Sequence, residues 1–117
     1  MAIKGVHAMF FSDRPEETRA FLRDKMQIPC FDSGGGWLIF HELEADMGVH
    51  PLSAEGKPKS GTHDISFYCE DLEAEVAGMK DRGVEFATGV EDQGFGLVTS
   101  LVLPGDIRVQ LYQPKYK

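Results

Sequence analysis

Residues 7–29 read HAMFFSDRPEETRAFLRDKMQIP, and residues 64–86 read DISFYCEDLEAEVAGMKDRGVEF. Aligned without gaps, the two stretches share identical residues at Phe10 and Phe67, Glu16 and Glu73, Ala20 and Ala77, and Asp24 and Asp81. Each stretch reads as a strand, a turn and an amphipathic helix, and such self-similarity indicates a repeated supersecondary unit. The chain is therefore predicted to consist of two similar modules related by a pseudo-twofold axis.

Composition narrows the class of protein. The 117 residues are enough for one domain with a core of its own, and the formal net charge is −7. An acidic chain without a Lys/Arg stripe is not expected to bind nucleic acid, and no apolar run is long enough to span a bilayer. Cys30 and Cys69 lack metal or redox spacing, and the short N-terminal stretch is too polar for a secretory signal. These features predict a cytoplasmic protein with free thiols whose partners are small molecules or other proteins.

The first module is predicted over residues 1–51. A strand at residues 5–12 precedes a helix that ends near Met26, with Asp13 as the expected N-cap. Three further strands follow at the ranges 28–32, 37–43 and 47–51, and the glycines at 34–36 predict a tight turn between the first two. Residues 52–61, which contain no apolar periodicity, are interpreted as the linker between the modules.

The second module is predicted over residues 62–117 in the same order. A strand at 63–69 is followed by a helix that Asp71 caps and Gly83 ends. The remaining predicted strands lie at 84–87, 97–103 and 107–112. Because each helix must bury one face against its sheet, the expected fold class is α+β, with two βαβββ modules that form a cup-shaped mixed sheet.

Three stretches resemble the vicinal oxygen chelate superfamily, which includes glyoxalases, bleomycin resistance proteins and extradiol dioxygenases. They are FFSDRPEETRAFLRD at 10–24, FYCEDLEAEVAGMKDRGVEF at 67–86 and TSLVLPGDIRVQLYQP at 99–114. The resemblance covers nearly the whole chain and implies the two-module cup. It also implies a homodimer, because small members of this type tend to associate. One such scaffold supports many activities, so the resemblance alone leaves the function open.

The resemblance also implies where a metal would be bound. Metal-using members carry one ligand on the first and last strand of each module, usually His or Gln, then Glu, His and Glu. In this chain the corresponding positions are His7, Gly48, Asp64 and Gln110. Only His7 matches. The absence of both glutamates favours a pocket without Fe, Zn, Ni or Mn, and the alternative metal set is His7, His50 and Asp64.

Strand alternation predicts which side chains face the cup, because residues two apart share a face. The predicted ligand-binding residues are Phe11, Ser66, Tyr68, Arg108, Gln110 and Tyr112. Arg108 can clamp a ligand carboxylate or phosphate, or form an ordinary salt bridge. His7 and Asp64 are the predicted catalytic pair, because a carboxylate beside an imidazole fixes its tautomer; the alternative is a structural hydrogen bond.

Two functions follow from these residues. The first is a binding protein whose cup holds a small polar or aromatic ligand without the usual metal set. The second is a metal-dependent enzyme, an extradiol-type dioxygenase or a glyoxalase-type lyase or isomerase, that uses His7, His50 and Asp64. The missing glutamates favour the first, and whether the chain is an enzyme stays open.

Overall fold

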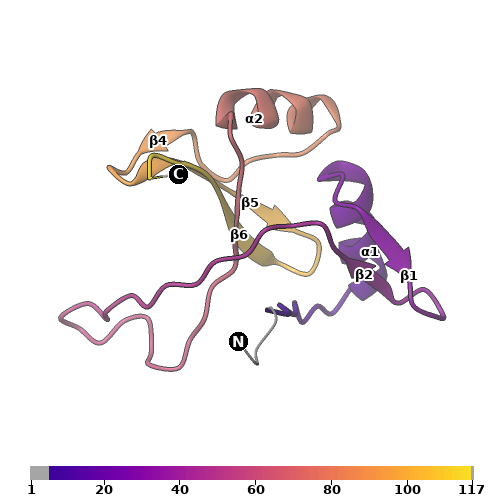
Figure 1. The fold of residues 1–117 in the computed structure, drawn as a ribbon, viewed down its shortest axis with the longest axis horizontal. Helices are drawn as coiled ribbons and strands as arrows, with labels where there is room; N and C mark the ends of the chain where they lie inside the picture. Colours follow the sequence, from indigo (N-terminus) through magenta and orange to yellow (C-terminus); the bar gives the residue numbers. More distant parts are fainter. Residues whose placement is uncertain (1–5, 117) are drawn as a thin grey trace.

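The computed structural model describes residues 6–116 and shows a mixed α+β chain (Figure 1). A four-stranded sheet has the strand order β3-β6-β5-β4, and a separate two-stranded sheet pairs β1 with β2. In chain order the elements are α1 Pro15–Ala20, η1 Phe21–Lys25, β1 Cys30–Asp32, β2 Leu38–Phe40, β3 Ser66–Tyr68, α2 Leu72–Asp81, β4 Glu91–Asp92, β5 Gly96–Leu103 and β6 Ile107–Pro114. Among residues 6–116, no helix combines the length and apolar character needed to cross a membrane.

The β5–β6 hairpin is the longest pairing of the structure. The two strands are antiparallel over their whole length, from Gly96 opposite Pro114 to Leu103 opposite Ile107. β3 pairs in parallel with β6 on the other side, which agrees with the predicted strand at 63–69. The predicted strand at 84–87 is wrong, because that stretch forms only a single bridge, between Phe86 and Leu101. The edge strand is instead β4, which lies further along the chain.

Helix α2 covers one face of the four-stranded sheet. As predicted, Asp71 caps it, with Oδ1 accepting a hydrogen bond from the Ala74 amide at 3.2 Å. The helix ends before Gly83, whose φ of +86° fits the predicted C-terminal glycine. Leu72 and Met79 are the buried residues of α2. They join a cluster that includes Leu101, Leu103, Val109 and Leu111 of the hairpin.

The first half contains the predicted helix and one predicted hairpin. The helix begins at Pro15 and its last turn, η1, is a π-helix that ends before Met26. The predicted cap at Asp13 is wrong: the N-cap residue is Arg14, and no side chain caps α1. The backbone amide of Arg14 donates a hydrogen bond to Ser12 Oγ at 2.9 Å. The glycine turn between β1 and β2 is as predicted, with positive φ at all three of its glycines.

The predicted outer strands of the first half are absent from the described residues. Residues 6–12 and 47–51 are assigned to no strand, and residue 5, where the first of these strands is predicted to begin, lies outside the described residues. A β-strand requires a hydrogen-bonded neighbour, and apolar alternation in the sequence does not supply one. Among residues 6–116 those two segments have no such neighbour, so the first half lacks a counterpart of the four-stranded sheet in the second half.

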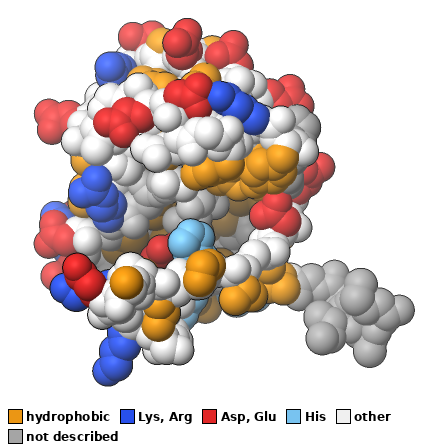
Figure 2. Space-filling view, turned by 90° about the vertical axis from the view of Figure 1, so that its left-hand side faces the viewer, with side chains coloured by type: hydrophobic (Ala, Val, Ile, Leu, Met, Phe, Trp, Pro, Cys, Tyr) orange, Lys and Arg blue, Asp and Glu red, His pale blue; other side chains and the backbone are white. Residues whose placement is uncertain are grey.

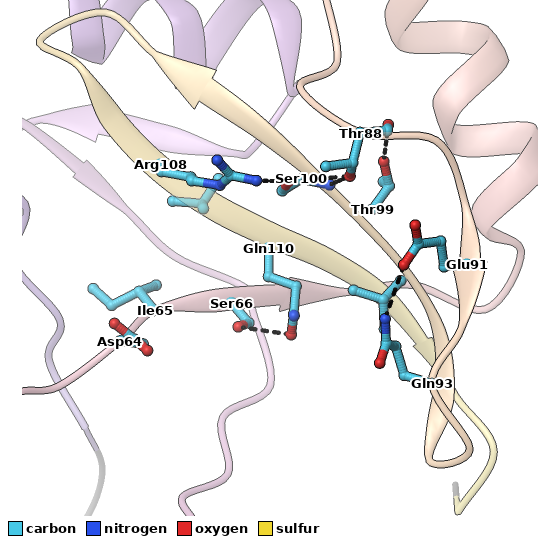
Figure 3. Close-up of a pocket in the computed structure, with 12 residues that line it drawn as sticks. Asp64, Ile65, Ser66, Thr88, Glu91, Gln93, Thr99, Ser100, Arg108 and Gln110 are labelled. Atoms are coloured by element: carbon cyan, nitrogen blue, oxygen red, sulfur yellow. Dashed lines mark hydrogen bonds between the residues drawn. The ribbon is translucent and has the colours of Figure 1, made fainter. Parts of the chain in front are cut away.

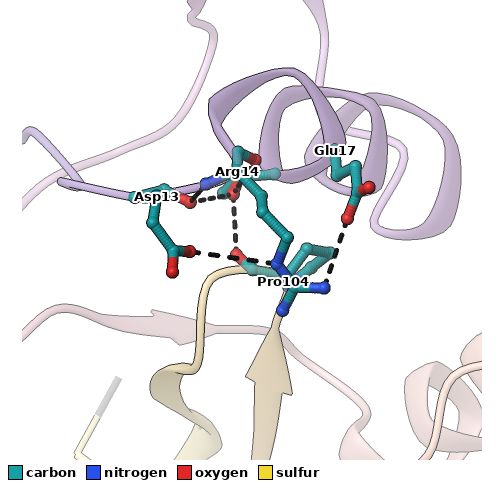
Figure 4. A network of polar contacts seen from close by, with 6 residues as sticks. Asp13, Arg14, Glu17 and Pro104 are labelled. Carbon is teal, nitrogen blue, oxygen red and sulfur yellow. Dashed lines mark hydrogen bonds and ion pairs between the residues drawn. The ribbon is translucent and has the colours of Figure 1, made fainter.

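A buried hydroxyl fixes the first helix to the β5–β6 turn. Thr18 is only 4% exposed, and its Oγ1 donates to the Pro104 carbonyl at 2.7 Å while Ser12 Oγ lies 2.8 Å away. Figure 4 shows the start of α1 on this turn, with Arg14 between Asp13 and Glu17. The turn that closes the hairpin is therefore also the support of the first half.

We predict that Gly105→Ala destabilises this junction. Gly105 has a φ of +94°, and a methyl group there would overlap Ser12 Oγ. Gly94→Ala is the matched control, because Gly94 has a φ of +85° but no atom within 4 Å of an added Cβ. Both changes strain the backbone, and Gly105→Ala should cost about 1–3 kcal/mol more because of the overlap. Urea unfolding measures the difference, and equal losses in the two variants would contradict this packing.

A second prediction concerns Cys69. Burial raises the pKa of Cys69 to about 11, and its Sγ lies 3.7 Å from the Tyr112 carbonyl oxygen. The thiolate is the reactive form, so in the folded protein its alkylation rate should keep rising up to about pH 11. In urea the alkylation rate should stop rising just above the ordinary thiol pKa of about 8.5. Iodoacetamide labelling of a Cys30→Ser variant isolates Cys69, with circular dichroism to verify folding. A folded-state plateau near pH 9 would show that Cys69 is not shielded.

Candidate ligand-binding site

The face of the four-stranded sheet opposite α2 carries a cavity of about 420 Å³. Strand register brings its polar side chains together: Gln110 lies between Ser66 on β3 and Ser100 on β5. Asp64, two residues before Ser66, and Arg108, two residues before Gln110, line the same cavity. Side chains on this face alternate with the buried core residues of the same strands. One hairpin therefore supplies both a hydrophobic core and a polar wall.

Four of the predicted site residues line this cavity, namely Asp64, Ser66, Arg108 and Gln110. Other lining residues were not predicted: Ile65 before β3, Thr88 in the loop after α2, Glu91 in β4, Gln93 between β4 and β5, Val98, Thr99 and Ser100 in β5, and Val109 in β6. For Ser100 the signal was present, since the turn at 104–106 sets a hairpin register in which Ser100 faces Gln110. For Thr88 and Glu91 the sequence holds no such signal, because the loop that carries Thr88 and the two-residue strand β4 that carries Glu91 are held by contacts with β5.

A chain of hydroxyl groups positions Arg108. Its Nη2 donates to Ser100 Oγ at 3.0 Å, and Ser100 Oγ lies 3.1 Å from Thr88 Oγ1 (Figure 3). Thr99 Oγ1 in turn donates to the Thr88 carbonyl at 2.9 Å. These contacts hold the guanidinium at the side of the cavity. They engage one of its two terminal nitrogens. Arg108 is exposed, so its remaining N–H groups can bind an anion bidentately.

The cavity carries charges of both signs. Asp64 and Glu91 are lining carboxylates, and Glu91 accepts a hydrogen bond from Gln93 Nε2 at 3.1 Å. Within the described part of the chain, Arg108 forms an ion pair with neither carboxylate. Gln110 Oε1 lies 3.5 Å from Ser66 Oγ, at the outer limit of a hydrogen bond, so both groups remain able to bind a ligand. The wall thus offers a cation, carboxylates and an amide to one small molecule.

Aromatic side chains follow the polar residues along the same face. Tyr68 lies two residues beyond Ser66, and its ring centroid is 6.0 Å from that of Tyr112. Tyr112, predicted to bind ligand, is buried against Phe95 and its hydroxyl lies 2.8 Å from that of Tyr116. Neither Tyr68 nor Tyr112 lines the cavity itself. The Tyr68 hydroxyl instead donates to Glu44 Oε2 at 3.1 Å.

The predicted residues of the first half lie outside this cavity. His7, Phe11 and His50 are exposed on segments that form no strand, and His50 Nδ1 lies 2.7 Å from the Pro51 carbonyl oxygen. In the described residues no hydrogen bond joins His7 to Asp64, so the catalytic pair stays a prediction. Residues 6–116 contain no group of three or more His, Cys, Asp or Glu side chains that could hold a metal. His7, His50 and Asp64 therefore do not form a metal-binding set among the described residues.

Solved structures of this fold include proteins of different activities. TnmS3, an antibiotic binding protein from Streptomyces sp. CB03234, is 21% identical with a TM-score of 0.69, over 98% of this chain and 99% of that chain. Lactoylglutathione lyase from Agrobacterium tumefaciens is 14% identical with a TM-score of 0.57, over 93% and 95% of the two chains. An integron cassette protein from V. cholerae is 19% identical with a TM-score of 0.55, over 96% and 98%. At these identities the likeness establishes the fold alone.

The family is established by sequence. No curated protein sequence matches the chain. The family model described as the Glyoxalase/Bleomycin resistance protein/Dioxygenase superfamily, however, matches residues 4–108, which is most of its length. Together with the α+β architecture and the structural neighbours, this match identifies the chain as a member of the glyoxalase/bleomycin resistance protein/dioxygenase superfamily.

Proposed function

We propose that this protein binds a small polar or aromatic molecule on the face of the sheet formed by β3, β6 and β5. The observation that carries the proposal is the placement of Arg108 and Asp64 in one cavity without an ion pair between them. Opposite charges that do not neutralise each other are available to a ligand. A single molecule with an anionic group and a hydrogen-bond donor satisfies both.

Each lining group has a role in this proposal. Arg108 binds a carboxylate or a similar planar anion, held in place by Ser100. Asp64 accepts a hydrogen bond from the other end of the ligand, and Gln110 can donate and accept between them. The ring of Tyr68 comes next along the face, where an aromatic part of the ligand can stack. The ligand class is therefore an aromatic acid that also carries a donor group.

One structural neighbour supports the binding function. TnmS3 is an antibiotic binding protein, which shows that a protein of this fold can serve as a binder. The lyase of the same fold represents the enzymatic alternative. That alternative needs His7, His50 and Asp64 to converge, and the described residues do not bring them together. The binding function is therefore the one the described site favours.

Compartment and assembly belong to the same proposal. A cytoplasmic location fits the free thiols Cys30 and Cys69, since a reducing compartment keeps thiols from pairing. A homodimer is the proposed assembly, because small members of this superfamily tend to associate.

We predict that Arg108→Gln weakens the binding of an aromatic carboxylate. Benzoates bearing an amino or hydroxyl donor are the probes, and their neutral amides are the matched compounds. The wild-type chain should prefer the acid, and Arg108→Gln should lose roughly tenfold or more in affinity for it, as expected for a hydrogen bond to a charged group. Affinity for the amide should change little. Titrations followed by ¹⁵N chemical shifts measure both.

Arg23→Gln is the control variant, because it removes the same charge from an exposed position on η1, where Arg23 pairs with Asp24 at 2.7 Å. It should bind the acid as the wild type does. Absence of binding to every acid, or equal weakening in both variants, would refute the proposal. Equal weakening would mean that only overall charge matters.

A further inference from the structure

We propose that Ser100 and Thr88 together supply a neutral hydrogen-bond donor beside Arg108, and that this donor binds one oxygen of the ligand's anionic group. The two hydroxyl groups then add to the preference of the site for an anion, which does not depend on the charge of Arg108 alone. Thr88 thereby gains a role in ligand recognition, which rests on the function proposed above because the ligand is the same.

The directions of the hydrogen bonds around Ser100 follow from the groups that can only donate. Arg108 has no acceptor, so its Nη2 donates to Ser100 Oγ at 3.0 Å. The backbone N–H of Ser100 donates to Thr88 Oγ1 at 3.1 Å. Each hydroxyl oxygen therefore already accepts one hydrogen bond, and Figure 3 shows Ser100 between the other two side chains.

Only one of the two hydroxyl hydrogens is used within the pair. Ser100 Oγ and Thr88 Oγ1 lie 3.1 Å apart, and either can donate the hydrogen bond that joins them. Whichever hydroxyl donates, the hydrogen of the other has no further acceptor among the described residues. One O–H group is therefore spare in both arrangements. Thr99 does not offer such a group, because it is buried and its Oγ1 donates to the Thr88 carbonyl.

The spare O–H group lies where the anionic group of the ligand is expected. Ser100 and Thr88 both line the cavity, and Thr88 is exposed while Ser100 is partly buried. Arg108 Nη2 and Thr88 Oγ1 contact the same atom, Ser100 Oγ, so the guanidinium and the hydroxyl pair are neighbours. Each carboxylate oxygen has two lone pairs, so a carboxylate bound by the guanidinium can accept a further hydrogen bond from the hydroxyl pair.

The overall charge of the protein does not favour an anion, so local donors must select it. The formal net charge is −7, and Asp64 and Glu91 line the same cavity. Figure 2 shows Lys and Arg side chains interspersed with Asp and Glu on the face it presents. Long-range attraction of an anion requires a field of positive sign, which such a surface does not provide. Short, directional hydrogen bonds from Arg108 and the hydroxyl pair supply the preference instead.

A double-mutant cycle on Thr88→Val and Ser100→Ala tests this assignment. Each single variant keeps one spare O–H group, on the residue that remains, and should lose no more than about twofold in affinity for the benzoate probes. The double variant keeps none and should lose roughly tenfold or more, as expected for a hydrogen bond to a charged group. The double loss then exceeds the product of the single losses. Titrations followed by ¹⁵N chemical shifts measure the affinities, and circular dichroism verifies folding.

A contact that only holds the loop would give the opposite pattern. Either single change would then break the same contact, so the double variant would lose no more than the larger single loss. That result, or losses that simply multiply, would overturn the assignment. Ser60→Ala/Thr62→Val is the matched control, because it removes the same two kinds of hydroxyl from exposed positions outside the cavity. The control should bind the probes as the wild type does.

Urea unfolding of the same variants without ligand tests the contact itself. Both changes break one hydrogen bond, so the double variant should lose less unfolding free energy than the sum of the single losses. A loss equal to that sum would overturn the hydrogen-bond count.

Failure of the hydroxyl donor is distinguishable from failure of the proposed function. A wild type that binds the acid, with weaker binding in Arg108→Gln but no excess loss in the double variant, refutes the hydroxyl donor alone. A wild type that binds no acid refutes both.

Discussion

Eight pairs of residues join β5 to β6, from Gly96 opposite Pro114 to Leu103 opposite Ile107, and this hairpin supports both the core and the cavity. One face carries Leu101, Leu103 and Val109 against α2. The other carries the polar wall around Gln110. The turn of the hairpin also accepts a hydrogen bond from Thr18 of the first helix. Loss of the β5–β6 pairing would therefore disrupt the hydrophobic core, the polar side of the cavity and the attachment of the first helix.

The ends of α2 and the facing of β6 could be predicted because their signals are local. Asp71 and Gly83 mark the ends of α2 through their own backbone chemistry. The period of two along residues 107–112 assigned Arg108 and Gln110 to the face opposite the core, and the structure agrees. In each case the determining interaction lies within a few residues along the chain.

In the first half, local sequence patterns did not predict the strands correctly. Residues 6–12 and 47–51 have the apolar alternation of strands but form none, because pairing depends on a neighbour far away in the sequence or in another molecule. Tyr112 shows the same limit on a smaller scale: its face was assigned correctly, but Phe95 and Tyr116 bury it. The metal set failed to converge for the same reason, since His7 and His50 lie on those unpaired segments. The loop that carries Thr88 and the short strand β4 that carries Glu91 are likewise positioned by tertiary contacts that no local pattern encodes.

The alternation along β5 and β6 separates two kinds of evolutionary change. Positions 100, 108 and 110 can be exchanged among polar residues to suit a new ligand while the neighbouring positions 101, 109 and 111 keep the interior filled. Divergence within such a strand should therefore be concentrated at every second residue. A scaffold organised in this way can acquire new ligand preferences without first losing thermodynamic stability.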